Sequence, residues 1–171
     1  MGYLSMAKKA GGAAKKEKPV FQALNNREAK PILAYLTEHF GFEGTLDYAF
    51  ILTAKNKLYA ASKEIFNLAV EELRVSSFGV YFGEWRDDQL RPSIEGSQII
   101  GPKCTKNVID LTIDQRNQWM NGEQINRTEQ MIETHGVVIL RCEDDYLGSG
   151  KISTELIYNY VPKNRRVRFS L

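Results

Sequence analysis

The stretch that decides the fold is residues 136–152, GVVILRCEDDYLGSGKI. Its first part, Gly136 to Cys142, has the strongest buried-strand pattern in the sequence, because apolar side chains follow one another without interruption at its centre. The acidic residues 143–145 indicate a turn, after which Tyr146 to Ser153 predicts a second strand. We expect these two strands to form the hairpin on which the second half of the chain is built.

The glycine-rich end of this hairpin, Gly148-Ser149-Gly150-Lys151, is partly similar to a phosphate-binding loop. A Walker A motif has four residues between its glycines and a Ser or Thr after the lysine, whereas Ile152 follows the lysine here. Glycines within a strand are typical of a bulge or of close approach by another part of the chain. We therefore interpret the motif as structural and expect no nucleotide hydrolysis.

Short elements surround the hairpin. Asn107 to Ile113 predicts a strand, Asp114 to Met120 a short helix, and Asn121-Gly122 a tight turn. After the hairpin, Leu156 to Val161 and a last segment near Arg166 to Leu171 predict two further strands. Several short strands with little helix indicate a small barrel.

The first half mixes helices and strands. A helix is predicted over Arg27 to Phe40, since apolar residues recur at helical spacing, Asn25 and Asn26 offer caps, and Gly41 follows. The same rules predict strands over 46–53, 58–61 and 78–85, and a helix from Ser62 to about Arg74. Residues 19–100 are thus expected to form an α+β unit.

Charge is distributed unevenly along the 171 residues, although the formal net charge is only +2. Residues 1–18 contain five lysines and one glutamate, whereas residues 19–160 contain 14 basic and 20 acidic residues. Clustered basic side chains attract phosphates and other acidic polymers. The C-terminal segment, which has no acid, carries Lys163, Arg165, Arg166 and Arg168.

Several classes of protein are excluded by composition. With 43% hydrophobic and 26% charged residues, the chain is typical of a globular protein, and we expect residues 1–18 to be a disordered tail. Apolar stretches such as Val137 to Leu140 are far shorter than the ~20 residues of a membrane span, and no signal peptide is recognisable. Cys104 and Cys142 are too few and too far apart for a disulfide framework, so a reducing compartment is expected.

No catalytic centre is recognisable. Cys104, Cys142, His39 and His135 are isolated from one another, so neither a zinc site nor a nucleophile with a neighbouring base is expected. The acidic groups at 87–88 and 143–145 are predicted to lie in turns, where solvated carboxylates rarely acquire the perturbed pKa values of an acid–base pair. We expect no cofactor, no metal and no enzymatic activity.

The basic C-terminal run allows two interpretations. If residues 167, 169 and 171 point into a core, strand alternation sends Arg166 and Arg168 outward together, with Lys163 and Arg165 just before them. Guanidinium groups on a rigid strand are suited to phosphate oxygens. Basic residues also protect the edges of sheets from further pairing, and the run alone does not separate these interpretations.

The second half resembles a PUA domain, the small RNA-binding pseudobarrel. The resemblance rests on the order of its motifs: a strand, a short helix that ends in Asn-Gly, an apolar strand, a turn and Leu-Gly-x-Gly. These motifs lie at 108–114, 119–122, 135–140 and 146–152.

The first half resembles the pre-PUA module of the Nip family of ribosome-biogenesis proteins. This resemblance rests on residues 56–62, 65–69, 77–85 and 90–94, and the two resemblances together cover about residues 28–155. The ending at 160–167, YVPKNRRV, is similar to the PUA segment of the NOL/NOP/Sun RNA cytosine methyltransferases.

The resemblance implies an α+β protein in which an α/β pre-PUA module precedes a PUA-type β pseudobarrel. The implied divisions are a basic tail at 1–18, the pre-PUA-like module at 19–102 and the PUA-like domain at 103–171. It also implies RNA binding without catalysis, through the short helix, its Asn-Gly turn and the last strand. Carried over to this chain, the RNA-binding residues are Gln118, Asn121, Gly122, Lys151, Lys163, Arg165, Arg166 and Arg168.

Trp119 is either a core residue or a platform on which a base stacks. The implied partner is RNA, with rRNA preferred over tRNA, and a methyltransferase or ribosome-assembly factor is a second candidate partner. The alternative function is that of a protein-interaction adaptor or a targeting subunit of an RNA methyltransferase, which exposed aromatics such as Tyr81 or Trp85 would favour. We expect a cytoplasmic location, or a nucleolar one in a eukaryote.

Overall fold

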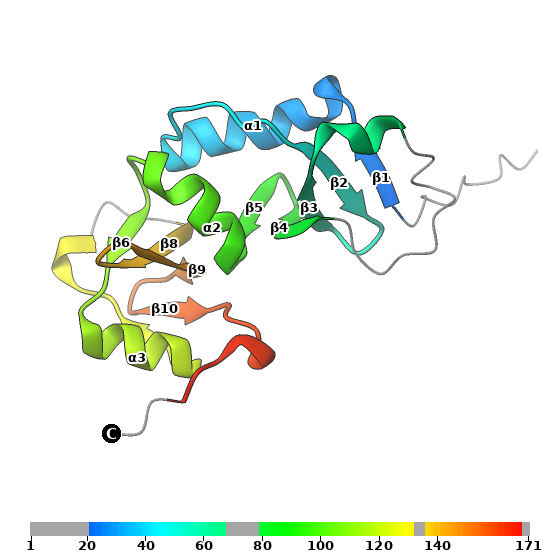
Figure 1. Cartoon of the computed structure of the whole chain (residues 1–171). Coiled ribbons are helices and arrows are strands. Elements are labelled where there is room, and N and C mark those ends of the chain that lie inside the picture. The colour runs from blue at the N-terminus through cyan, green and yellow to red at the C-terminus, as the bar shows by residue number, and fades with distance from the viewer. Residues whose placement is uncertain (1–20, 68–78, 132–135, 169–171) are drawn as a thin grey trace, which may run out of the picture.

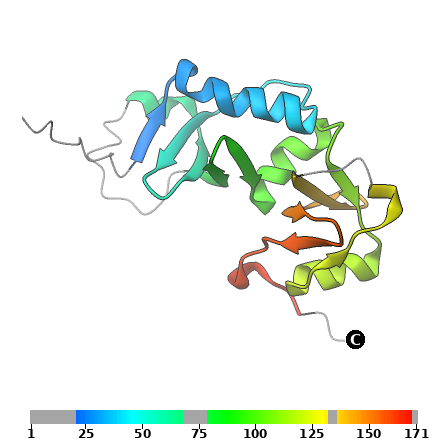
Figure 2. The same cartoon turned by 180° about the vertical axis from the view of Figure 1, so that it is seen from behind.

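The computed structural model describes residues 21–67, 79–131 and 136–168 (Figure 1). Their strands form two five-stranded sheets, a first sheet ordered β1-β2-β3-β4-β5 and a second sheet ordered β6-β8-β9-β10-β7. The fold is therefore α+β, as predicted. Its two sheets lie side by side, with α1 running along both of them (Figure 2).

The first sheet is an antiparallel meander. Helix α1, Asn26–Phe40, follows its first strand and confirms the predicted helix, including its caps. The Asn25 side chain accepts from the Arg27 and Glu28 amides, and Gly41 ends the helix in the left-handed conformation. The strands are β1 Phe21–Leu24, β2 Ala49–Thr53, β3 Lys57–Ala61, β4 Val80–Arg86 and β5 Gln89–Pro92.

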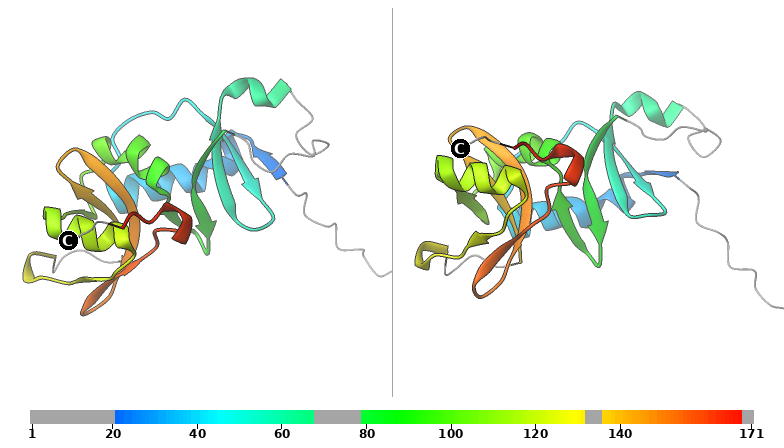
Figure 3. Two further views of the ribbon diagram at one scale, coloured as in Figure 1. Left: turned by 60° about the horizontal axis from the view of Figure 1, so that its bottom comes forward. Right: turned by 90° about the horizontal axis from the view of Figure 1, so that it is seen from below.

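The second sheet curls around α3, Ile113–Asn121 (Figure 3). Its centre is the predicted hairpin, β8 Gly136–Cys142 and β9 Asp145–Ile152. Strand β6 pairs with β8 in parallel, whereas the remaining strands pair antiparallel. The outer strands are β6 Val108–Asp110, β10 Leu156–Asn159 and β7 Ile125–Asn126.

Strand β9 contacts different partners through its two faces. Gly150 lies against the ring of Trp119, where a Cβ atom would come within 2.6 Å of the indole. On the other face, the Ser149 hydroxyl donates to the Pro92 carbonyl of the first sheet at 2.7 Å. The close approach predicted for these glycines is therefore confirmed at Gly150.

A shared core joins the two sheets. Val137, Ile139 and Tyr146 of the second sheet belong to the same buried cluster as residues of α1 and of the first sheet, such as Phe40 and Phe82. Helix α2, Ile94–Ile100, lies between them and was not among the predicted elements. The chain leaves α2 through the short turn η3, Gly101–Lys103.

Two predicted elements differ from the structure. The expected strand near 166–171 is wrong for its described part: Lys163–Arg165 is a 3-10 turn, η5, residues 166–168 are irregular, and Val167 is 46% exposed. Of the helix expected from Ser62 to Arg74, the described part is a 3-10 turn, η1, Lys63–Asn67. The tail at 1–18, the rest of that helix, Phe169 and Leu171 lie outside the described residues. A further 3-10 turn, η4, is Glu129–Met131.

We predict that Trp119→Ala lowers the free energy of unfolding by about 3–5 kcal/mol, because it empties the space between α3 and Gly150. The Trp119 side chain is 0% exposed and its Nε1 donates to the Leu147 carbonyl at 3.0 Å. Urea unfolding followed by circular dichroism measures the change. Ile113→Ala is the matched control on the same helix, since Ile113 is 54% exposed. Equal losses in the two variants would contradict this packing.

Candidate nucleic-acid interface

The C-terminal end of α3 is held in place from two directions. Gly122 has φ 94° and ψ 15°, a left-handed conformation that glycine adopts without strain, and its amide donates back into the last turn of α3. From β10, the Asn159 side-chain amide donates to the carbonyls of Trp119 and Glu123 at 2.7 and 2.8 Å. The end of the helix is thus a rigid part of the fold.

The C-terminal segment docks on this helix end. The side chain of Arg166 lies directly against the Cα of Gly122, where any side chain on that glycine would overlap it. Arg166 Nε also donates to the Val161 carbonyl at 3.3 Å, and the Val167 amide donates to the Met120 carbonyl at 2.9 Å. These contacts position Arg166 without the strand that the sequence predicted.

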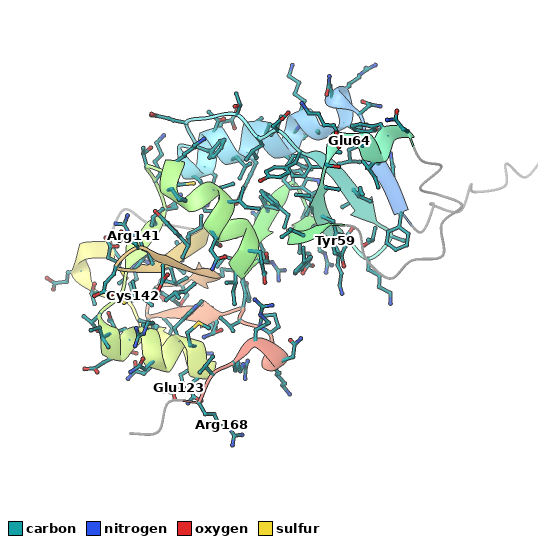
Figure 4. All side chains as sticks on the ribbon, in the orientation of Figure 1. Tyr59, Glu64, Glu123, Arg141, Cys142 and Arg168 are labelled. Carbon is teal, nitrogen blue, oxygen red and sulfur yellow. The ribbon has the colours of Figure 1, made fainter. Side chains whose placement is uncertain are left out.

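Polar and basic groups surround Arg166 on the surface. Gln118 and Asn121 are exposed, and the Asn121 amide donates to Glu123 Oε1 at 2.6 Å. Arg168 is exposed and its side chain points away from the ribbon at the same edge of the molecule as Glu123 (Figure 4). We call this surface the α3-end face; it consists of Gln118, Asn121, Gly122, Arg166 and Arg168.

Three of the predicted binding residues, Lys151, Lys163 and Arg165, do not belong to the α3-end face. Lys151 neighbours Gly150 on β9, so strand alternation places it on the face of the sheet away from Trp119. Arg165 forms an ion pair with Glu95 of α2 and is thereby directed toward the first sheet. Lys163 is exposed on η5.

Trp119 is a core residue. Its ring is fully buried, and its indole nitrogen is satisfied by the Leu147 carbonyl. No face of the ring is available to a base, so the stacking alternative is wrong for the folded chain.

A cavity of about 480 Å³ lies between the two sheets. It was not predicted, because its lining residues come from sequence positions as distant as 57 and 165 and only the fold brings them together. Tyr81, Arg91 and Glu95 line it from the first sheet and α2, and Tyr160 and Arg165 line it from the C-terminal segment.

Burial raises the pKa of the Cys104 thiol to about 12, which keeps it protonated and unreactive at neutral pH. Across residues 21–67, 79–131 and 136–168, no three His, Cys, Asp or Glu side chains are grouped so as to hold a metal ion. No helix in these ranges is both long and apolar enough to cross a membrane.

Comparison with known families identifies the part of the chain that forms the α3-end face. Residues 106–167 match the family model described as the methyltransferase RsmF PUA domain. The C-terminal part of the chain is a PUA domain. Such domains generally bind RNA, and the match relates this one to an RNA methyltransferase. The matched range covers the second sheet and α3 but none of the first sheet, and no curated protein matches the chain.

We predict that Gly122→Ala destabilises the PUA domain by about 1–2 kcal/mol, since a Cβ atom is strained in the left-handed conformation and would displace Arg166. Urea unfolding measures the loss. Gly44→Ala is the control, because Gly44 lacks a positive φ and the nearest atom to its Cβ belongs to the flexible Lys103 side chain. A fully stable Gly122→Ala protein would show that the glycine is not required there.

Proposed function

We propose that this chain is a non-catalytic RNA-binding protein of rRNA maturation or ribosome biogenesis that holds structured RNA with its α3-end face. The observation that carries the proposal is the position of Arg166, which is fixed against Gly122 at the end of α3 within a PUA domain. A guanidinium held in this way can donate two parallel hydrogen bonds to phosphate oxygens with little further loss of freedom.

The surroundings of Arg166 suit RNA. Gly122 has no side chain, and this leaves room for the Arg166 guanidinium to lie against the end of α3. The exposed amides of Gln118 and Asn121 can both donate and accept hydrogen bonds, which suits 2′-hydroxyl groups and the base edges of a shallow minor groove. Arg168 adds a second exposed cation at the same edge. The α3-end face thus combines phosphate contacts with groups that distinguish RNA from DNA.

We further propose that the first sheet with α1 is a pre-PUA-like module, as the sequence resemblance implies. The core that it shares with the second sheet supports a single rigid platform rather than two tethered domains. The proposed partners are rRNA, with tRNA as the second RNA, and a methyltransferase or assembly factor. A cytoplasmic location, or a nucleolar one in a eukaryote, fits such a role.

The second candidate function is that of a targeting subunit or protein adaptor for an RNA methyltransferase. The observation in its favour is the kinship of the PUA domain with that of a methyltransferase. The two aromatic residues expected to form a protein-docking surface on the first sheet give this second function little support. Tyr81 and Trp85 are only partly exposed, and Trp85 packs against the core, with its ring centroid 6.0 Å from that of Tyr35.

We predict that the double variant Arg166→Glu/Arg168→Glu binds a structured rRNA fragment at least about 10-fold more weakly, because two phosphate contacts become repulsive. Cross-linking of the wild-type protein to cellular RNA and sequencing names the fragment, and fluorescence anisotropy then measures its affinity. The control Lys30→Glu/Lys55→Glu makes the same change of charge at exposed positions of the first half. Unchanged binding by the Arg variant, with its fold verified by circular dichroism, would refute this interface.

We also predict that the affinity of the wild-type protein falls steeply with salt, because phosphate contacts release counterions. The slope of log affinity against log salt concentration becomes shallower by roughly 1–2 in the Arg166→Glu/Arg168→Glu variant. Anisotropy titrations at several salt concentrations measure both slopes. Salt-independent binding would show that phosphate contacts do not dominate.

A further inference from the structure

We propose that the chain has a second RNA-binding surface, which takes single-stranded RNA along the side of the second sheet that faces the first sheet. This inference rests on the proposed function and extends it to a different surface. The surface combines three tyrosines with three basic residues, and we call it the tyrosine–basic strip. Its members are Lys151, Tyr158, Tyr160, Arg91, Tyr81 and Lys57.

The strip begins on the second sheet. Tyr158 of β10 pairs with Lys151 of β9, so the two side chains stand next to each other on one face. This is the face of Val137 and Ser149, directed toward the first sheet, whereas Gly150 on the opposite face lies under Trp119. Lys151 is exposed and Tyr158 is 44% exposed, so both side chains are accessible to a ligand.

The strip continues across the boundary between the sheets. Tyr160 follows β10, and the guanidinium carbon of Arg91 from β5 lies 4.7 Å from the centroid of its ring. A cation–π contact of this kind restrains both side chains, and an arginine or tyrosine plane is a surface on which a base can stack. Arg91 and Tyr160 also line the 480 Å³ cavity, which has the volume of a small-ligand pocket.

The far end of the strip lies on the first sheet. Tyr81 of β4 lines the same cavity, with Tyr59 tilted against it at 5.5 Å between ring centroids. Lys57 lies 6.0 Å from the Tyr81 ring and is exposed at the start of β3. The half-buried Tyr81 ring therefore packs against Tyr59 and has the Lys57 ammonium group near it.

The charge of the strip favours an anionic ligand. Glu84 is opposite Lys57 in the sheet and 3.9 Å from Arg91, so one carboxylate accompanies these two cations, and Lys151 is the third cation of the strip. Glu95 at the wall of the cavity is engaged by Arg165. The excess positive charge lies next to the tyrosines, so the phosphates of a nucleic acid can contact the cations while its bases stack on the rings.

This combination selects single strands over duplexes. Each base of a single strand has an exposed π-face that can stack on tyrosine or arginine, while its phosphates contact the neighbouring cations. In a duplex these faces are already stacked on one another. The strip is therefore suited to an unpaired segment next to the structured RNA held by the α3-end face.

Both surfaces meet at η5. Arg165 is directed to the cavity through Glu95, and the next residue, Arg166, is directed to Gly122. Figure 3 shows this C-terminal turn between the strands of the first sheet and α3. One RNA can thus pass from the α3-end face to the strip around a basic turn.

The test compares three RNAs with the full chain: a blunt hairpin, the same hairpin with a tail of about six uridines, and the uridine oligomer alone. We expect the tail to raise the affinity of the wild-type protein about 10-fold. Lys151→Glu/Tyr158→Ala, at two exposed positions, should remove this gain and change binding of the blunt hairpin less than about 2-fold. Lys57→Glu tests the far end of the strip in the same way.

Tyr48→Ala is the control for loss of an exposed tyrosine, because Tyr48 precedes Ala49, which pairs with Ala61 at the end of β3 away from Lys57. If the uridine tail still raises the affinity in the strip variants, the inference is overturned. The same result is expected if the strip binds a protein and not RNA. Failure of the blunt hairpin to bind at all refutes the proposed function instead. In that case the uridine oligomer decides: binding that is lost in Lys151→Glu/Tyr158→Ala supports the strip, and no binding overturns it.

Discussion

The close packing of Trp119 against Gly150 is the contact on which the second half of the fold depends. Only a glycine leaves room for the indole at this point of β9, and the contact commits one face of the strand to α3. Residues on the other face of β9 can then contact the first sheet, as Ser149 does by its hydrogen bond to the Pro92 carbonyl. Both proposed RNA surfaces follow from this division, because α3 ends at Gly122 on one side while Lys151 is presented on the other.

Much of the fold could be predicted from local pattern. The apolar run of β8 and the capped helix α1 carry enough information within a few residues to specify their own structure. Helix α2 could not be predicted in this way, because it is short and contains Gly96, which is explained by the backbone of Phe82 close to it. The alternation of residues 166–171 predicted a strand that its described part does not form, because the pairing of a segment is decided by distant parts of the chain. A strand needs a neighbour with free hydrogen-bonding groups, whereas the Val167 amide is bonded to Met120 at the end of α3.

The sequence predicts several residues of the candidate site, but it does not predict which of them lie together. Gly122 and Arg166 were both selected from sequence, for backbone access and for phosphate binding, and the structure shows that they touch. The separation of Lys151 from them depends on which face of β9 carries Trp119, and that information comes from the packing of a distant helix. The partners of Tyr160 and Arg165 could not be predicted from the sequence either, since Arg91 and Glu95 belong to the other half of the chain.

The small net charge of +2 is consistent with RNA binding once the charges are placed on the fold. Several acids are engaged by basic partners, such as Asp110, whose pKa is lowered by hydrogen bonds from Arg141. Arg165 and Arg91 are engaged by Glu95 and Glu84, whereas the exposed Lys163, Lys151 and Lys57 belong to η5 and to the tyrosine–basic strip. Arg165 and Arg166 point in different directions because one is held by Glu95 and the other by the helix end at Gly122. A short basic turn therefore connects two surfaces on opposite faces of one sheet, and this connection is the path that we propose for RNA on a modestly charged chain.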